Sequence, residues 1–79
     1  MKKLEDDHYF YTLWLDEATG DLYLEAVCGR VAIFELAIKL TNKEVAEYAQ
    51  NPGFVRGLAQ DIVDAPDTYI ERRVTVPAP

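Results

Sequence analysis

The sequence predicts an α+β domain, in which an antiparallel β-meander of three or four strands carries two short helices on one face. Three observations predict this fold class. Apolar and polar residues alternate through most of residues 8–40, as in half-buried strands. The second half of the chain repeats apolar residues at three- and four-residue spacing, as in amphipathic helices. The whole chain, residues 1–79, has the length of one domain.

Two alternating segments open the predicted sheet, HYFYTLWLD (residues 8–16) and DLYLEAV (residues 21–27). They flank EATG (residues 17–20), a turn sequence whose glycine can adopt a positive φ. A four-residue loop pairs Leu15 with Leu22 and puts the leucines of both strands on one face.

The third predicted strand, residues 30–40, follows a turn that contains Cys28. A shift of one residue in register would turn every side chain to the other face. A loop of residues 27–29 pairs Ala26 with Arg30 and keeps the apolar residues together, with glycine at the position that needs positive φ. A two-residue turn would instead bring glutamates among the core residues. The three-residue loop is therefore preferred, and the predicted inner face consists of Tyr9, Tyr11, Leu13, Leu15, Leu22, Leu24, Ala26, Ala32, Phe34, Leu36, Ile38 and Leu40.

Two helices are predicted to cover that face. Thr41 and Glu44 have the spacing of a capping box, which starts a helix over about residues 42–50. Asn51 and Pro52 end this helix and start the next, with asparagine as the N-cap and proline at the first helical position. The residues expected to face the sheet are Val45, Tyr48 and Ala49 in the first helix and Phe54, Val55, Leu58, Ala59, Ile62 and Val63 in the second.

The carboxy-terminal segment allows two interpretations. TYIERRVTV (residues 68–76) alternates, so a fourth strand is preferred. The alternative is a turn of helix at residues 66–70 followed by a loose tail. The ends of the chain, residues 1–7 and 77–79, are expected to be loose.

Composition excludes some classes of function. Fourteen acidic residues against eight basic ones give a net charge of −6, which disfavours binding to DNA or RNA and favours a basic protein partner. No apolar run approaches the ~20 residues that span a membrane, and the amino terminus lacks the apolar region of a secretory signal. The single cysteine cannot form an internal disulfide. A cytoplasmic protein is therefore expected.

No group of residues has a catalytic pattern. Cys28 is expected to be a turn residue, because no helix start accompanies it to lower its pKa. Residues 5–8 combine three carboxylates with the only histidine, but one histidine on a loose terminus does not define a metal site. Asp16 and Asp21 flank an exposed turn, which is no cleft. We therefore expect no enzyme, no metal site and no cofactor.

The outer face of the predicted sheet is the best candidate for function. It gathers aromatic, apolar and acidic residues, and aromatic residues dominate protein interfaces. The sequence thus predicts a protein-interaction or self-associating module, with a homodimer as one form. The expected interaction residues are Phe10, Trp14, Tyr23, Glu25, Ile33 and Glu35.

Two alternative functions remain open. The chain could be an immunity-type inhibitor of a basic toxin or nuclease, since such inhibitors can be small and acidic. A small-molecule binder could instead use a pocket between sheet and helices near Tyr9, Tyr11 and Tyr48.

Four short motifs, LYLEAVCG, LTNKEVAEY, LAQDI and YIERR, together with Pro66, resemble a family of small bacterial domains with no established activity. The resemblance covers about residues 22–73. It implies a bacterial, cytoplasmic α+β domain and transfers no active-site residue.

Overall fold

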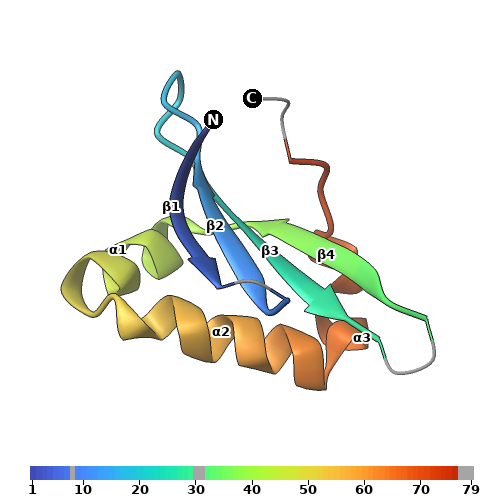
Figure 1. Ribbon diagram of the computed structural model, residues 1–79. Helices are drawn as coiled ribbons and strands as arrows, with labels where there is room; N and C mark the ends of the chain where they lie inside the picture. Colours follow the sequence, from blue (N-terminus) through green and yellow to red (C-terminus); the bar gives the residue numbers. More distant parts are fainter. Residues whose placement is uncertain (8, 30–31, 77–79) are drawn as a thin grey trace.

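The computed structural model describes residues 1–7, 9–29 and 32–76. It has two layers, an antiparallel sheet and a layer of helices on one face of that sheet (Figure 1). The strands lie in the order β1-β2-β3-β4, which is a meander, so the predicted fold class is confirmed. The elements are β1 (Lys2–Asp7), β2 (Tyr11–Leu15), β3 (Leu22–Cys28), β4 (Phe34–Lys39), α1 (Asn42–Gln50), α2 (Gly53–Asp64), α3 (Pro66–Tyr69) and the 3-10 helix η1 (Ile70–Arg72).

The hairpin of β2 and β3 has the predicted register, with Leu15 opposite Leu22. Gly20 adopts a φ of +81°, as the turn sequence required. Asp16 stabilises the turn, because its Oδ1 accepts a hydrogen bond from the backbone N–H of Ala18 at 3.0 Å. The leucines of the two strands consequently share a face.

The hairpin of β3 and β4 has the predicted faces but a different register. Ala26 pairs with Leu36, six positions beyond the predicted Arg30. The three-residue loop is therefore wrong, and Cys28 is the last residue of β3 rather than a turn residue. An even shift leaves each side chain on its original face, which is why Leu36, Ile38 and Leu40 are buried as predicted.

Residues 2–7 form β1, so the expectation of a loose amino terminus is wrong for this segment. Its acidic side chains are held by other elements. The hydroxyl of Tyr11 donates to Glu5 at 2.6 Å, and Arg56 in α2 donates to Asp7 at 2.6 Å. These partners lie elsewhere in the chain, so the polar composition of the segment did not reveal its pairing. Residues 77–79 lie outside the described residues.

The helices begin close to where the capping sequences predicted. Thr41 and Glu44 form the complete capping box, in which each side chain accepts from the backbone N–H of the other. The second helix starts one residue later than predicted, with Pro52 as the N-cap. The side chain of Asn51 still accepts from the N–H of Gly53, at 3.2 Å. Ala49, predicted to face the sheet, is exposed, because α1 presents only its Val45 and Tyr48 side to the core.

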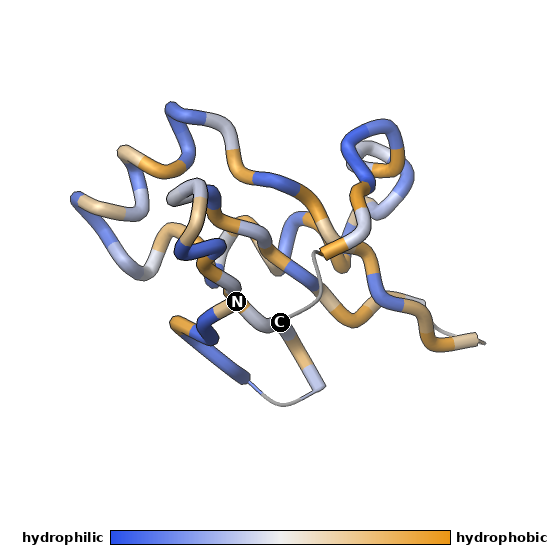
Figure 2. Tube along the Cα trace, turned by 90° about the horizontal axis from the view of Figure 1, so that it is seen from above, coloured by the Kyte–Doolittle hydropathy of each residue, from blue (hydrophilic) through white to orange (hydrophobic). Residues whose placement is uncertain are grey.

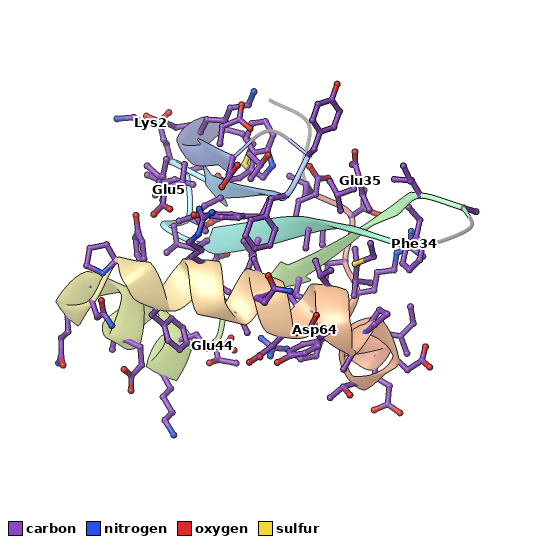
Figure 3. The ribbon with its side chains drawn as sticks, turned by 60° about the horizontal axis from the view of Figure 1, so that its bottom comes forward. Lys2, Glu5, Phe34, Glu35, Glu44 and Asp64 are labelled. Atoms are coloured by element: carbon purple, nitrogen blue, oxygen red, sulfur yellow. The ribbon has the colours of Figure 1, made fainter. Side chains whose placement is uncertain are left out.

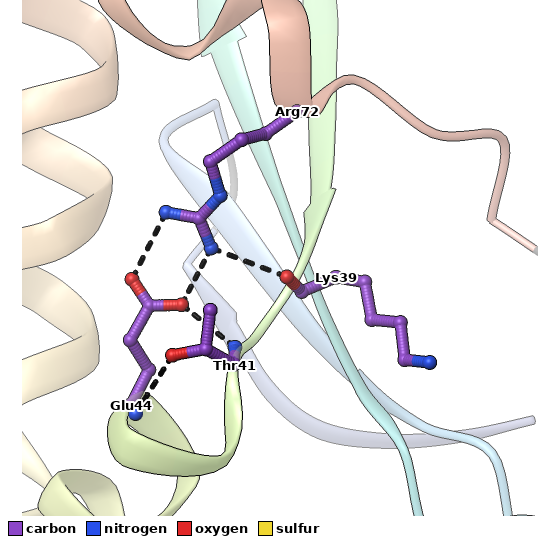
Figure 4. Close-up of polar contacts among 4 residues, drawn as sticks. All are labelled: Lys39, Thr41, Glu44 and Arg72. Carbon is purple, nitrogen blue, oxygen red and sulfur yellow. Dashed lines mark hydrogen bonds and ion pairs between the residues drawn. The ribbon is translucent and has the colours of Figure 1, made fainter.

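Residues 68–76 do not add the preferred fourth strand, and the alternative interpretation is closer. The segment continues as α3 and η1, since Pro66 is suited to the first turn of a helix. Figure 4 shows how Arg72 fixes its end. The guanidinium of Arg72 binds both carboxylate oxygens of Glu44, at 2.5 and 3.1 Å, and the carbonyl of Lys39 at 3.2 Å.

The core lies between the sheet and the helices. It is built from one face of each of β2, β3 and β4 and from one side of α2. Its most completely buried side chains are Leu13, Leu24, Cys28, Leu36, Ile38, Val55 and Ile62. Three residues assigned to the inner face are instead exposed: Tyr9, which has a φ of +68°, and Ala32 and Phe34, which the longer loop moves to the hairpin end.

Candidate functional site

An open pocket lies at the end of the β3–β4 hairpin, between β4 and the carboxy-terminal segment. Its volume is about 530 Å³. Figure 3 shows Phe34 and Glu35 there, at the far end of the view from Lys2 and Glu5. We call it the hairpin-end pocket, and its lining residues are Glu25, Ile33, Phe34, Glu35, Ala37 and residues 73–76.

The rim of the hairpin-end pocket is apolar and exposed. The exposed fractions are 79% for Ile33, 39% for Phe34 and 37% for Val74. Figure 2 marks the start of β4 as hydrophobic at the outermost end of the hairpin. Side chains of this size are normally buried, and a group of them around a pocket is typical of an interaction site.

Two carboxylates lie within this apolar surround. Burial, and then the neighbouring carboxylate of Glu35, raise the pKa of Glu25 above its ordinary value. The indole N–H of Trp14 is close enough to Glu25 to lower this pKa in part. That N–H is buried, and its geometry does not meet the criteria for a hydrogen bond with any of the described residues. The surroundings of Glu25 therefore disfavour its charged form, while Arg73 also lines the pocket.

The carboxy-terminal segment forms the other wall of the pocket. Arg73 makes one isolated antiparallel bridge with Ile38. The backbone N–H of Val74 donates to the carbonyl of Ala37 at 2.9 Å. The guanidinium of Arg73 also donates to the backbone carbonyl of Glu35 at 3.5 Å. The segment is thus attached to the edge of β4 over residues 72–74, with one of these hydrogen bonds running between backbone groups.

The structure brings together three of the six residues that the sequence singled out, Glu25, Ile33 and Glu35. Trp14 and Tyr23 are cross-strand neighbours, as predicted, but Tyr23 is only 9% exposed and Lys3 covers the Trp14 ring at 5.4 Å. They therefore contribute little open surface to a partner.

Phe10 is not part of this site. Its ring packs edge-on against Tyr11, and Arg56 lies 5.1 Å from the ring centre. The residue precedes β2 in a turn, after Tyr9 with its positive φ, and so does not follow the alternation that placed it on the outer face.

Sequence reasoning missed Phe34, Arg73 and Val74. The predicted short loop puts Phe34 in the middle of its strand and in the core, whereas Phe34 is the first residue of β4 and lies at the hairpin end. The alternation of residues 68–76 predicts a full strand, whereas the structure has one isolated bridge in this segment, at Arg73. The alternation of apolar and polar residues does not determine the loop length that brings these side chains together.

The chemical candidates named from the sequence have structural roles. Cys28 is buried, with its Sγ near the carbonyls of Ala26 and Ile62 at 3.8 and 3.9 Å, and burial raises the pKa of its thiol. This is the opposite of the shift that activates a nucleophile. Asp21 pairs with Lys39 across the sheet at 3.4 Å.

The acidic amino terminus is engaged within the fold. Asp6 accepts from Lys3 and Thr12, both at 3.4 Å, in addition to the contacts of Glu5 and Asp7 described above. His8 lies outside the described residues. Among the residues that the structure does describe, no group of three or more His, Cys, Asp or Glu side chains is placed to hold a metal ion.

The tyrosines that suggested a small-molecule pocket differ in their surroundings, although Tyr11 and Tyr48 both lie beside Glu5. Tyr11 is buried in the core, and burial followed by its hydrogen bond to Glu5 raises its pKa to about 12. Tyr9 is 84% exposed, whereas Tyr48 packs against the core cluster. None of these three tyrosines lines the hairpin-end pocket.

Comparison with known proteins finds no family model, no curated protein and no solved structure that matches the chain. Within the described part of the chain, none of the helices combines the length and apolar character needed to cross a membrane.

Proposed function

We propose that this chain is a small protein-interaction module that binds its partner at the hairpin-end pocket. One observation carries the proposal. Three exposed apolar side chains, Ile33, Phe34 and Val74, surround a pocket that also contains Glu25 and Glu35. An apolar contact area with polar groups at defined positions is the ordinary composition of a protein interface.

Charge supports a basic partner. The net charge of −6 steers a basic protein toward the chain, and the two glutamates in the pocket give that attraction a local target. An immunity-type inhibitor of a basic toxin or nuclease is a narrower form of the proposal, supported by charge and size. We also propose a cytoplasmic location, because the single cysteine needs no oxidising compartment.

A pair of matched substitutions tests the proposal. Ile33→Ser removes the most exposed apolar side chain of the pocket, and Ile70→Ser makes the same change at a 46% exposed residue outside it. Wild type and both variants are used for quantitative affinity capture from a native lysate. Their self-association is measured by sedimentation velocity.

We expect Ile33→Ser to reduce the amount of captured protein by about tenfold. If the wild type dimerises, we expect the dimerisation constant of the variant to fall by the same factor, which corresponds to the loss of one well-packed apolar contact at an interface. Ile70→Ser should behave as wild type. Equal capture by all three proteins, together with a wild type that sediments only as a monomer, would contradict the proposal.

A further inference from the structure

We propose that the edge of β4 binds an extended segment of a partner by strand addition, in place of the chain's own residues 73–76. The segment we infer carries an arginine or lysine followed by alternating β-branched residues. This inference rests on the proposed function and gives the partner's chemistry.

The edge of β4 is only partly paired with another strand. The chain's own segment contacts its backbone through the bridge between Arg73 and Ile38 and the hydrogen bond from Val74 to Ala37. The carbonyls of Lys39 and Glu35 accept from side chains instead, the guanidinium groups of Arg72 and Arg73. Residues 74–76 then leave strand geometry, although β4 extends back to Phe34. An edge strand with unpaired backbone groups is a template for an added strand.

The segment that already lies at this edge indicates what the edge accepts. The guanidinium of Arg73 donates to the backbone carbonyl of Glu35, and Arg73 lines the same pocket as Glu25 and Glu35. Val74 and Val76 line the same pocket as Ile33 and Phe34. A partner strand with a basic residue and β-branched residues would reproduce these contacts and add backbone hydrogen bonds along β4.

The opposite edge of the sheet has features that oppose strand addition. The pairing of β1 with β2 is interrupted by a bulge between Lys3 and Glu5, and β1 carries five charged residues among six. Bulges and charged residues are the usual protection of an exposed edge. β4 carries one glutamate and one lysine in six residues, so the two edges differ in their capacity to pair.

Charge distinguishes a basic partner from a second copy of β4. Antiparallel pairing of two β4 edges across the unoccupied part would bring two Glu35 side chains close together, beside the Glu25 of each copy. Like charges facing each other across strands are destabilising. A basic segment instead meets the carboxylates of the pocket with opposite charge.

A synthetic peptide provides the test. The probe is fluorescein-labelled IERRVTV, which copies residues 70–76, and its binding to the full chain is followed by fluorescence anisotropy. Val74→Pro removes the N–H that donates to Ala37 and so detaches the competing segment. Arg73 has a ψ of 132°, which suits a residue before proline, so the substitution introduces no strain there.

We expect the peptide to bind Val74→Pro about fivefold more tightly than wild type, the effect of one competing backbone hydrogen bond. Glu35→Lys should weaken binding by about fivefold, while Glu17→Lys, the same change at an exposed turn residue, should leave it unaltered. A peptide with glutamate in place of its second arginine should bind more weakly than the original.

Absence of binding to both wild type and Val74→Pro would overturn strand addition, as would equal effects of Glu35→Lys and Glu17→Lys. Concentration-dependent dimerisation of Val74→Pro would also overturn it, because the occupant would then be a second copy. The Ile33→Ser comparison decides the proposed function separately, since that experiment does not depend on how the partner binds.

Discussion

Gly29 is the residue that the second hairpin needs most. Its φ is +107°, and a Cβ placed on it would lie 2.0 Å from the carbonyl oxygen of Ala32. Both the conformation and the contact exclude a side chain. Gly20 has a similar φ of +81°, but a Cβ there would meet nothing within 4 Å.

We predict that Gly29→Ala destabilises the protein by about 2–4 kcal/mol, whereas Gly20→Ala costs about 1 kcal/mol from the φ alone. The difference reflects the clash with the backbone of Ala32, which must move. Urea unfolding of the two variants measures it. Equal losses of stability would contradict a costly clash between residue 29 and the carbonyl of Ala32.

Cys28 shows what local patterns could and could not establish. The predicted loop assigned it to no face, whereas the structure buries it on the face shared with Leu24 and Ala26. The burial of Cys28 depends on how far β3 extends. β3 continues to Cys28, where the carbonyl of Ile62 in α2 lies 3.9 Å from the Sγ atom. That contact joins residues 34 positions apart, so no local signal could reveal it.

Among the elements, the contact between α1 and η1 depends on Glu44. Burial raises the pKa of Glu44, but the hydrogen bonds from Arg72 and from Thr41 outweigh this, so the pKa is lowered overall. A carboxyl group whose pKa is lowered by folding stabilises the protein above its ordinary pKa. This contribution is lost as the pH falls through the lowered value.

We predict that Glu44→Gln destabilises the protein by about 1 kcal/mol at pH 7, since the pair with Arg72 is partly exposed. Glutamine can still serve in a capping box, so the substitution isolates the ion pair. The difference from wild type should shrink as the pH falls below the ordinary pKa of glutamate, as measured by urea unfolding. A loss of stability that does not change with pH would assign the effect to the cap instead.

The elements also show how much of the fold could be predicted. Alternation and capping sequences predicted three strands and two helices, because these signals lie within each element. The pairing of β1 and the register of β4 depend on contacts between elements, such as Arg56 with Asp7, and on a loop whose length the pattern leaves open. The same loop length decides which residues meet in the hairpin-end pocket, so only three of its nine lining residues, Glu25, Ile33 and Glu35, were predicted.

At the scale of the whole molecule, two of the fourteen acidic residues, Glu25 and Glu35, lie together at the hairpin-end pocket. Burial and the carboxylate of Glu35 raise the pKa of Glu25. For an acid with a raised pKa, the folded state binds its proton more tightly than the unfolded chain. Stability is therefore lost as the pH rises from the ordinary pKa through the raised one.

We predict that Glu25→Gln stabilises the free protein at pH 7, because it removes a partly buried charge beside Glu35. The gain should disappear as the pH falls below the ordinary pKa of glutamate, because Glu25 is then protonated in both the folded and the unfolded chain. Thermal unfolding at pH 7 and at a pH below that pKa measures this, with Glu17→Gln as the exposed control. Destabilisation at both pH values would show that the carboxylate stabilises the fold.

Such a cost is understandable if the carboxylates serve binding, since groups retained for function often reduce stability. The most direct test is an amide-resolved NMR titration of the full chain with the protein that it captures. We predict chemical-shift changes concentrated at Glu25, residues 33–37 and residues 73–76, and little change along α1. Changes concentrated on the helices, with the hairpin-end pocket unaffected, would contradict the account.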